Sequence, residues 1–260
     1  MGIPELGQAL LLGAVQGITE FLPISSTAHL LLLTRWLGWT TVGEKFYVDA
    51  IQFGSVIAVL LYFAQDIRQI LLGSRDPDSV ERRLLVGIGV GTLPALIVGY
   101  LIQDHLPDQS WVIGSLQIVM ALLLAAAERW GSRKRTLKDL RVGDGFWVGL
   151  GQTVALLPGA SRSGCTLTAA LALGLERAAA ARFAFLLGIP TLTIATLYQS
   201  RRAFGSSGEV LLLLTGIGSA FVFSYLAIAW LLRFLQHHST RSFIIYRILL
   251  GIGILLAQAF

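Results

Sequence analysis

Two short polar runs interrupt an otherwise apolar chain, and both contain residue types that phosphoryl chemistry uses. The first run is PISST at residues 23–27, with Glu20 before it and His29 after it. The second is PGASRSGCT at residues 158–166, which contains Arg162. Hydroxyl groups can act as nucleophiles, carboxylates and imidazoles can take up a proton, and a guanidinium binds phosphate oxygens in a bidentate manner. The two runs therefore predict a site for a phosphate or diphosphate group.

Each run also predicts the start of a helix. The first amides of a helix lack partners within it and carry a partial positive charge, so an anion is the expected guest. Serine and threonine are favoured as N-cap residues. The candidate hydroxyls are Ser25, Ser26 and Thr27 in the first run, and Ser161, Ser163 and Thr166 in the second.

Three further observations connect these runs with catalysis. Gln16 and Glu20 are four residues apart, so they share one face of the helix before the first run. His29 follows Ser26 by three, which makes a serine nucleophile with a histidine base geometrically reasonable. Arg162 would stabilise the charge on a phosphoryl group during its transfer. Two simpler interpretations stay open: each run alone could be a helix kink, and Glu20 could be only a structural partner of Arg162.

The remaining polar residues have more ordinary interpretations. Asp49 is expected to complement the start of its helix, with a second carboxylate for a cation as the alternative. Cys165 is the single cysteine, which excludes an internal disulfide, and it is expected to be a small packing residue. His105, His237 and His238 fall in predicted loops and are expected to be solvated.

The composition of the chain requires a lipid environment. Among 260 residues, 55% are hydrophobic and 13% are charged, and the mean hydropathy is +0.71. Soluble domains carry about a quarter charged residues. The net charge of +5 is therefore interpreted as a result of membrane topology and not as a sign of nucleic-acid binding. The first residues lack a basic region, so we interpret them as mature sequence.

The apolar stretches predict an all-α polytopic membrane protein with one membrane domain, residues 1–260. Two stretches, 6–38 and 146–175, are broken by the polar runs into halves of roughly 10 to 15 residues, which are too short to span a bilayer. Six others approach the roughly 17–25 residues of a spanning helix. These lie at residues 46–65, 84–102, 111–128, 178–199, 210–233 and 243–259.

The order of these elements repeats along the chain. A broken stretch and three spans form a first repeat at residues 1–130, and the same order follows at 145–260 after a polar linker at 131–144. If each broken stretch enters and leaves by the same face, every repeat crosses three times and the second repeat is inverted. The two re-entrant helical hairpins then meet near the midplane. If the broken stretches span the membrane, the repeats are parallel.

The distribution of basic residues favours the inverted arrangement. Under it, fifteen Lys and Arg residues, Arg247 among them, fall on one side, and four fall on the other. The positive-inside rule then places the linker in the cytoplasm and both termini outside. The linker is interpreted as a solvated loop that fixes orientation, with recruitment of lipid head groups as the alternative. The four residues of the other side are Arg35, Lys45, Arg201 and Arg202.

The sequence resembles the undecaprenyl-diphosphate phosphatase family, also known as BacA or UppP. The (E/Q)xxxE motif of the family, followed by PxSSxxH, appears here as QGITEFLPISSTAH, and its PGxSRSxxT motif appears as PGASRSGCT. Two further stretches, AIQFG and RFAFLLGIP, also match the family pattern. The resemblance covers essentially the whole chain.

The resemblance implies removal of the terminal phosphate from undecaprenyl diphosphate at the outer face of the bacterial cytoplasmic membrane, which recycles the lipid carrier of cell-wall synthesis. It further implies a divalent cation, calcium or magnesium, near Glu20 and Gln16. Gln16 stands where many relatives have Glu, so a tightly held metal is less expected. The implied catalytic residues are Glu20, Ser26, His29 and Arg162, and the implied phosphate-binding residues are Ser25, Thr27, Ser161, Ser163 and Thr166.

The expected partners are a prenyl diphosphate lipid and the membrane lipids, with no nucleic acid, and a homodimer is left open. A secondary transporter or a flippase for an anionic lipid is the alternative function, because inverted repeats, broken helices and a midplane anion site also describe carriers. A nucleophile and a base are needed only by an enzyme, so they favour catalysis.

Overall fold

The computed structural model describes residues 5–39, 45–102, 105, 107, 109–200 and 210–257, and this part of the chain is all-helical. One short 3-10 helix, η2, lies in the linker at Leu137–Asp139. The α-helices are α1 (Glu5–Phe21), α2 (Ser26–Leu37), α3 (Lys45–Tyr62), α4 (Ala64–Gly73), α5 (Val80–Ile102), α6 (Ser110–Trp130), α7 (Val142–Val154), α8 (Arg162–Ala172), α9 (Arg177–Ser200), α10 (Val210–His237) and α11 (Arg241–Leu256).

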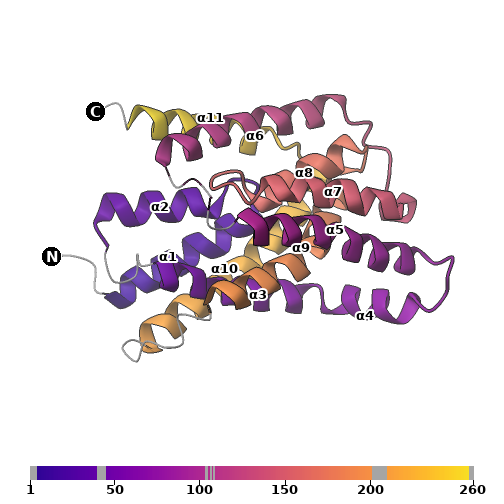
Figure 1. Cartoon of the computed structure of the whole chain (residues 1–260), viewed down its shortest axis with the longest axis horizontal. Coiled ribbons are helices and arrows are strands. Elements are labelled where there is room, and N and C mark those ends of the chain that lie inside the picture. Colours follow the sequence, from indigo (N-terminus) through magenta and orange to yellow (C-terminus); the bar gives the residue numbers. More distant parts are fainter. Residues whose placement is uncertain are drawn as a thin grey trace.

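Two pairs of helices reach the middle of the molecule from opposite ends. In Figure 1, α1 and α2 run side by side from the left end, and α7 and α8 run from the right end. Each pair turns at one of the polar runs identified in the sequence. The turns are at residues 22–25 and 155–161. Each turn and the helix ends beside it form what we call a tip: residues 20–29 are the first tip and residues 155–166 are the second.

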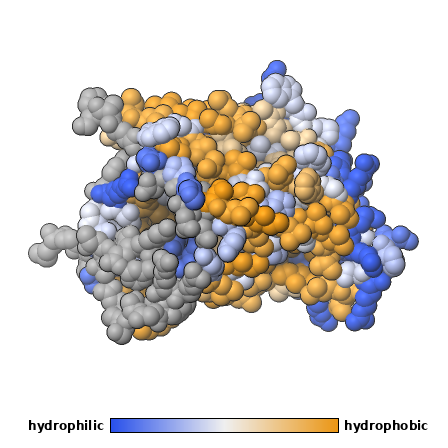
Figure 2. Space-filling model, viewed as in Figure 1, coloured by the Kyte–Doolittle hydropathy of each residue, from blue (hydrophilic) through white to orange (hydrophobic). Residues whose placement is uncertain are grey.

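Four helices of the described part are long and apolar enough to cross a membrane, namely α5, α6, α9 and α10. The pair α3 and α4 would add a fifth if it forms one bent span. The sixth predicted span, 243–259, corresponds to α11, which has 16 described residues, and residues 258 and 259 lie outside the described part. Figure 2 shows a hydrophobic surface over the middle of the molecule, with hydrophilic residues gathered at the right end. A multi-pass membrane protein is therefore confirmed.

The segment between the predicted spans 46–65 and 84–102 is not simply a loop, because α4 occupies Ala64–Gly73. The chain bends by 57° between α3 and α4. Phe63 at the bend is fully buried, and the guanidinium of Arg182 lies 5.7 Å from its ring centroid while it pairs with Asp66. Ile70 packs into the core from the next turn. These tertiary contacts stabilise a helix that its own short sequence does not reveal.

The linker is ordered by its own hydrogen bonds. The amide and the hydroxyl of Thr136 donate to Asp139 Oδ2 at 2.8 and 2.9 Å. The hydrogen bond from the Thr136 amide is the main reason why the pKa of Asp139 lies below its ordinary value. Arg135 pairs with Asp144 at 2.5 Å and also donates to the carbonyl of Leu173. The linker therefore ties the start of α7 to the end of α8.

One basic residue was assigned wrongly from the sequence. Arg247 was counted with the basic residues at the linker end, but its side chain is fully buried inside the helix bundle, at the two tips. Its position within the apolar stretch 243–259 is the signal that could have placed it there, since an arginine inside a membrane segment is a functional candidate. Of the four basic residues predicted for the other end, Arg201 and Arg202 lie outside the described residues, as does the side chain of Lys45.

Small residues allow the helices to approach closely. A Cβ on Gly91 of α5 or on Gly145 of α7 would overlap the backbone of the facing helix. The same holds for Gly13 of α1 against Gly216 of α10. Close backbone approach through glycine is a common basis of helix packing in membranes. The first helix of each pair is thus packed on a span from the other half of the chain.

We predict that Gly91→Ala destabilises the protein by roughly 1–3 kcal/mol, the usual cost of overpacking. Its methyl group would overlap the backbone carbonyl of Gly145. Gly89→Ala is the matched control, because a Cβ there meets nothing within 4 Å on the same helix. Thermal unfolding in detergent measures both variants. Equal melting temperatures for the two variants would contradict this account of the packing.

Candidate functional site

The two tips share the same local geometry. Ser25 and Ser161 are the N-caps of α2 and α8, with φ of 74° and 72°. Each serine hydroxyl accepts a hydrogen bond from the amide three residues later, Ala28 N at 3.4 Å and Gly164 N at 3.2 Å. A positive φ is uncommon for a residue other than glycine and is often found at functional sites. The structure thus selects one cap from the candidates in each run.

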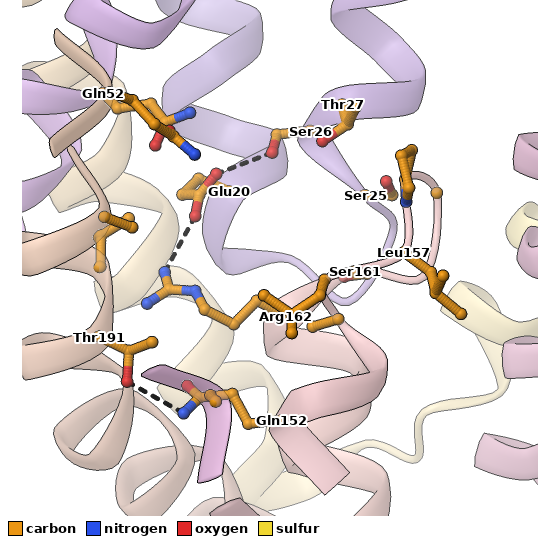
Figure 3. A pocket seen from close by; sticks show the side chains of 18 residues that line it. Glu20, Ser25, Ser26, Thr27, Gln52, Gln152, Leu157, Ser161, Arg162 and Thr191 are labelled. Carbon is orange, nitrogen blue, oxygen red and sulfur yellow. Dashed lines mark hydrogen bonds and ion pairs between the residues drawn. The ribbon is translucent and has the colours of Figure 1, made fainter. Parts of the chain in front are cut away.

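Glu20 joins the two tips. Its Oε1 accepts a hydrogen bond from Arg162 Nη2 at 2.9 Å, which makes an ion pair between α1 and α8. Its Oε2 accepts from Ser26 Oγ at 2.7 Å and from Gln16 Nε2 at 3.1 Å. Figure 3 shows the carboxylate between the arginine and the serine. The side chains of Glu20 and Arg162 are only 9% and 18% exposed, so solvent screens the pair weakly.

Two further bonds hold the second tip in place. Arg162 Nη1 donates to the carbonyl of Gly188 in α9 at 2.8 Å. Ser163 Oγ donates to the carbonyl of Leu22 at 2.9 Å, directly between the tips. Thr166 Oγ1 donates to the carbonyl of Arg162 within α8. The hydroxyls of Ser163 and Thr166 are therefore engaged with main-chain oxygens.

His29 lies apart from Ser26 in this arrangement. Its Nδ1 is 2.7 Å from the carbonyl of Ser25, and its Nε2 is 2.6 Å from the hydroxyl of Tyr246 in α11. A carbonyl can only accept, so Nδ1 carries the proton and Nε2 accepts from the tyrosine. The two rings are also stacked, with an interplanar angle of 4°. The predicted Ser26–His29 hydrogen bond is not formed, and the Ser26 hydroxyl donates to Glu20 instead.

A cavity of about 250 Å³ lies beside the Glu20–Arg162 pair, and both tips line it. Ser25, Ser26, Thr27, Ser161 and Arg162 contribute to its wall, whereas His29, Ser163 and Thr166 do not. One side is apolar, with small and aliphatic residues of α5 and α9. These are Ala95, Leu192 and Ala195.

Four polar residues of this cavity are not among the predicted site residues: Gln52, Gln152, Thr191 and Gln199. Gln152 Nε2 donates to Thr191 Oγ1 at 3.0 Å, as Figure 3 shows. Gln52 lies next to a second cavity of about 530 Å³, which shares Ser26 and Thr27 with the first and extends to Arg35. The signal for Gln152 was its offset: it follows Gln16 by 136 residues, as Ser161 follows Ser25.

The tips offer limited support for a cation. Among the described residues, no group of three or more His, Cys, Asp and Glu side chains has the arrangement of a metal site. Gln16 Oε1 is buried and has no hydrogen-bond partner, which leaves one free oxygen donor beside the Glu20 carboxylate. Calcium and magnesium prefer six or more oxygen ligands. The donor set therefore fits a cation that a diphosphate ligand coordinates in large part.

A known family model covers most of the chain. The family model described as "Bacitracin resistance protein BacA" matches residues 9–253. The chain belongs to this BacA family. The BacA match includes both tips and every residue placed in the site above.

Several BacA relatives are similar over nearly their whole length. The chain is 59% identical to an undecaprenyl-diphosphatase of Thermosynechococcus vestitus over 252 residues, which are 94% of this chain and 92% of the relative. It is 53% identical to an undecaprenyl-diphosphatase of Synechococcus sp. (strain JA-3-3Ab), over 98% of this chain and 95% of the relative. A third relative of the same name, from Trichodesmium erythraeum, is 46% identical over 96% of this chain and 85% of its own.

We predict strong coupling between Glu20 and Arg162 in thermal unfolding. Glu20→Gln or Arg162→Gln alone leaves one buried charge without its partner, which should destabilise the protein by roughly 3–5 kcal/mol. The double variant has two neutral amides and should be more stable than the sum of the single effects indicates.

The pair Arg182 and Asp66 is the control for this cycle, because the arginine is 41% exposed and its coupling should stay below about 1 kcal/mol. Additive effects at Glu20 and Arg162 would show that the two tips do not meet through this pair.

Proposed function

We propose that the chain is an integral membrane undecaprenyl-diphosphatase, which hydrolyses undecaprenyl diphosphate to undecaprenyl phosphate and inorganic phosphate. The observation that carries the proposal is the meeting of Ser26, Glu20 and Arg162 at two helix N-termini. This arrangement places a nucleophile, a proton acceptor and a fixed cation around one anion site. The names of the curated relatives agree with this activity. The product is the lipid carrier of cell-wall synthesis in its reusable form.

We propose the finer topology of an inverted repeat with two re-entrant hairpins. Residues 1–130 form the first repeat and 145–260 the second. The similar caps at Ser25 and Ser161, and the entry of the two hairpins from opposite ends, support this reading. The basic linker lies in the cytoplasm, and the site opens to the outer side of the bacterial cytoplasmic membrane, where both termini lie. The end of the second cavity near Arg35 is on that outer side.

The substrate is bound in two parts. The diphosphate enters the cavity at the tips, where the first amides of α2 and α8 and the hydroxyl of Thr27 are available to its oxygens. The prenyl chain leaves the cavity past the apolar residues of α5 and α9 and stays in the lipid. Because the prenyl chain stays in the lipid, binding exposes none of its apolar surface to water.

The reaction begins at Ser26. Its Oγ attacks the terminal phosphorus, the bond from that phosphorus to the bridging oxygen breaks, and undecaprenyl phosphate leaves. Arg162 exchanges its bond with Glu20 for bonds to phosphate oxygens, while Gly188 holds the guanidinium in place. Glu20 is then free to take the proton of Ser26, to which it is already hydrogen-bonded. A water molecule next attacks the phosphorus of the phosphoserine, the bond from that phosphorus to Ser26 Oγ breaks, Glu20 returns its proton to Oγ, and phosphate leaves.

A calcium or magnesium ion is a further proposal. When bound, it would neutralise charge on the diphosphate, and Glu20 and Gln16 would be its protein ligands. The pairing of Glu20 with Arg162 lowers the negative charge available to the ion, so the diphosphate itself would supply most of the affinity.

The test of the function is phosphate release from undecaprenyl diphosphate by the purified protein in detergent. We expect Ser26→Ala to lose roughly 10²-fold or more in turnover, as expected for loss of a nucleophile. His29→Ala should lose less than the roughly 10²–10⁴-fold that a general base contributes. A pure transporter or flippase would release no phosphate in this assay.

Two outcomes would change the mechanism. If Ser26→Ala keeps most of its turnover, water attacks the diphosphate directly. If His29→Ala is as inactive as Ser26→Ala and equally well folded, His29 is the base and the side chains rearrange before the reaction.

We predict that Gln16→Glu strengthens cation binding, because it places a second carboxylate beside Glu20. Calcium should then raise the melting temperature of the variant at lower concentrations than it does for the wild-type protein. Gln152→Glu is the control, since Gln152 is also buried at the cavity but has no carboxylate among its hydrogen-bond partners. Equal calcium responses of Gln16→Glu and Gln152→Glu would remove Gln16 from the cation site.

A further inference from the structure

Arg247 of α11 is a fully buried cation that the mechanism above does not use. Its guanidinium donates to three main-chain carbonyls: Nη1 to Pro23 O at 3.2 Å, and Nη2 to Gly159 O at 3.2 Å and Ala160 O at 2.9 Å. Pro23 belongs to the first tip, and the other two acceptors belong to the second. A single side chain from a distant helix therefore binds both tips at once.

The charge of Arg247 is balanced in an unusual way. The arginines that pair with carboxylates are partly exposed, 18% for Arg162 and 26% for Arg135, whereas the fully buried Arg247 is hydrogen-bonded only to main-chain oxygens of the described residues. Its Nε is buried and has no hydrogen-bond partner. An isolated buried charge is costly, and structural contacts between helices can be made by apolar residues at lower cost. Retention of this cation at the two tips therefore indicates a task beyond packing.

The surroundings of Arg247 are fitted to its guanidinium. A Cβ on Gly164, in the first turn of α8, would lie 2.6 Å from Arg247 Nη1, so any larger residue there would displace the guanidinium. The residue before Arg247, Tyr246, is hydrogen-bonded to His29 of α2. Helix α11 thus contacts the first tip through two successive residues and the second tip through one of them.

The bonded carbonyls stand directly before the residues that do the chemistry. Ala160 precedes Ser161 and Arg162, and Pro23 precedes the cap Ser25 by two residues. Because the peptide unit is planar and trans, fixing the oxygen of Ala160 also fixes the direction of the Ser161 amide. The orientation of the anion-binding amides and the distance between the two tips therefore both depend on Arg247.

We propose that Arg247 is a positioning residue for the hydrolysis, which holds the two tips in the register where Ser26 and Arg162 face one phosphoryl group. The inference rests on the proposed function. Lysine keeps the charge but has no planar fork for carbonyls of two separate tips. A shift of the reacting groups by about 1 Å can lower turnover roughly 10²-fold.

The first test is the kinetics of Arg247→Lys with undecaprenyl diphosphate in detergent. We expect kcat to fall roughly 10²-fold, with KM changed much less, because transition-state geometry and not uniform binding is lost. Arg177→Lys is the matched control, an arginine of the Glu128 cluster near the linker that should keep its activity. Melting temperatures of both variants separate misplacement from unfolding.

A second variant keeps Arg247 itself. Gly164→Ala introduces a methyl group that displaces the guanidinium, and it should lower kcat in the same way as Arg247→Lys. Gly253→Ala in α11 meets nothing within 4 Å and should turn over like the wild-type protein. This pair decides the question if Arg247→Lys does not fold.

The outcomes are distinct. Wild-type kcat in Arg247→Lys, or in Gly164→Ala if the lysine variant does not fold, overturns the positioning role while the phosphatase activity stands. The positioning role is also overturned if the loss of activity is fully explained by the fraction of the variant protein that is unfolded. Absence of phosphate release from the wild-type protein would instead reject the proposed function.

Discussion

The contact between the two tips is the interaction on which the rest of this structure depends. Each tip interrupts a helix inside an apolar bundle and exposes amides that lipid cannot satisfy. The ion pair of Glu20 and Arg162, the bond from Ser163 to Leu22, and the bonds from Arg247 join one tip to the other. Polar groups that would be unfavourable inside the apolar bundle without hydrogen-bond partners thereby become partners of one another. The same groups form the wall of the cavity.

The scaffold around the tips brings the two halves of the chain together. The first helix of each hairpin packs through glycine on a span of the other half, α1 on α10 and α7 on α5. Neither tip can be placed without the opposite half. Close backbone packing of this kind is rigid, which suits groups that must keep their geometry to within a fraction of an ångström.

The two tips carry different chemical groups at positions related by one sequence offset, and this difference gives the site two roles. With the offset of 136 residues that relates Ser25 to Ser161, Ser26 corresponds to Arg162 and Glu20 corresponds to Leu156. One tip thus carries the proposed nucleophile and proton acceptor, and the other carries the cation. The leucine adds an apolar residue to the wall of the cavity. An anionic head group with an apolar chain is the kind of ligand that such a cavity fits.

The sequence by itself determined the features that depend on local composition and spacing. A charged fraction of 13% requires lipid as solvent, the prolines and serines break two helices, and an acid before one break complements the arginine after the other. These inferences hold because apolar length, helix capping and charge are properties of short segments. The sequence offered the pairing of Glu20 with Arg162 only as an alternative, on the ground of their opposite charges.

Only the tertiary structure decided which groups face each other. The sequence did not indicate the hydrogen-bond partners of four residues, Ser26, His29, Gln152 and Arg247. The spacing of Ser26 and His29 allowed a pair, but the rotation of α2 turns the histidine toward Tyr246 and the serine toward Glu20. Arg247 looks like one more basic residue near a helix end until α11 is packed against both tips. Side-chain direction is set by helices from distant parts of the chain, so spacing within one segment cannot determine it.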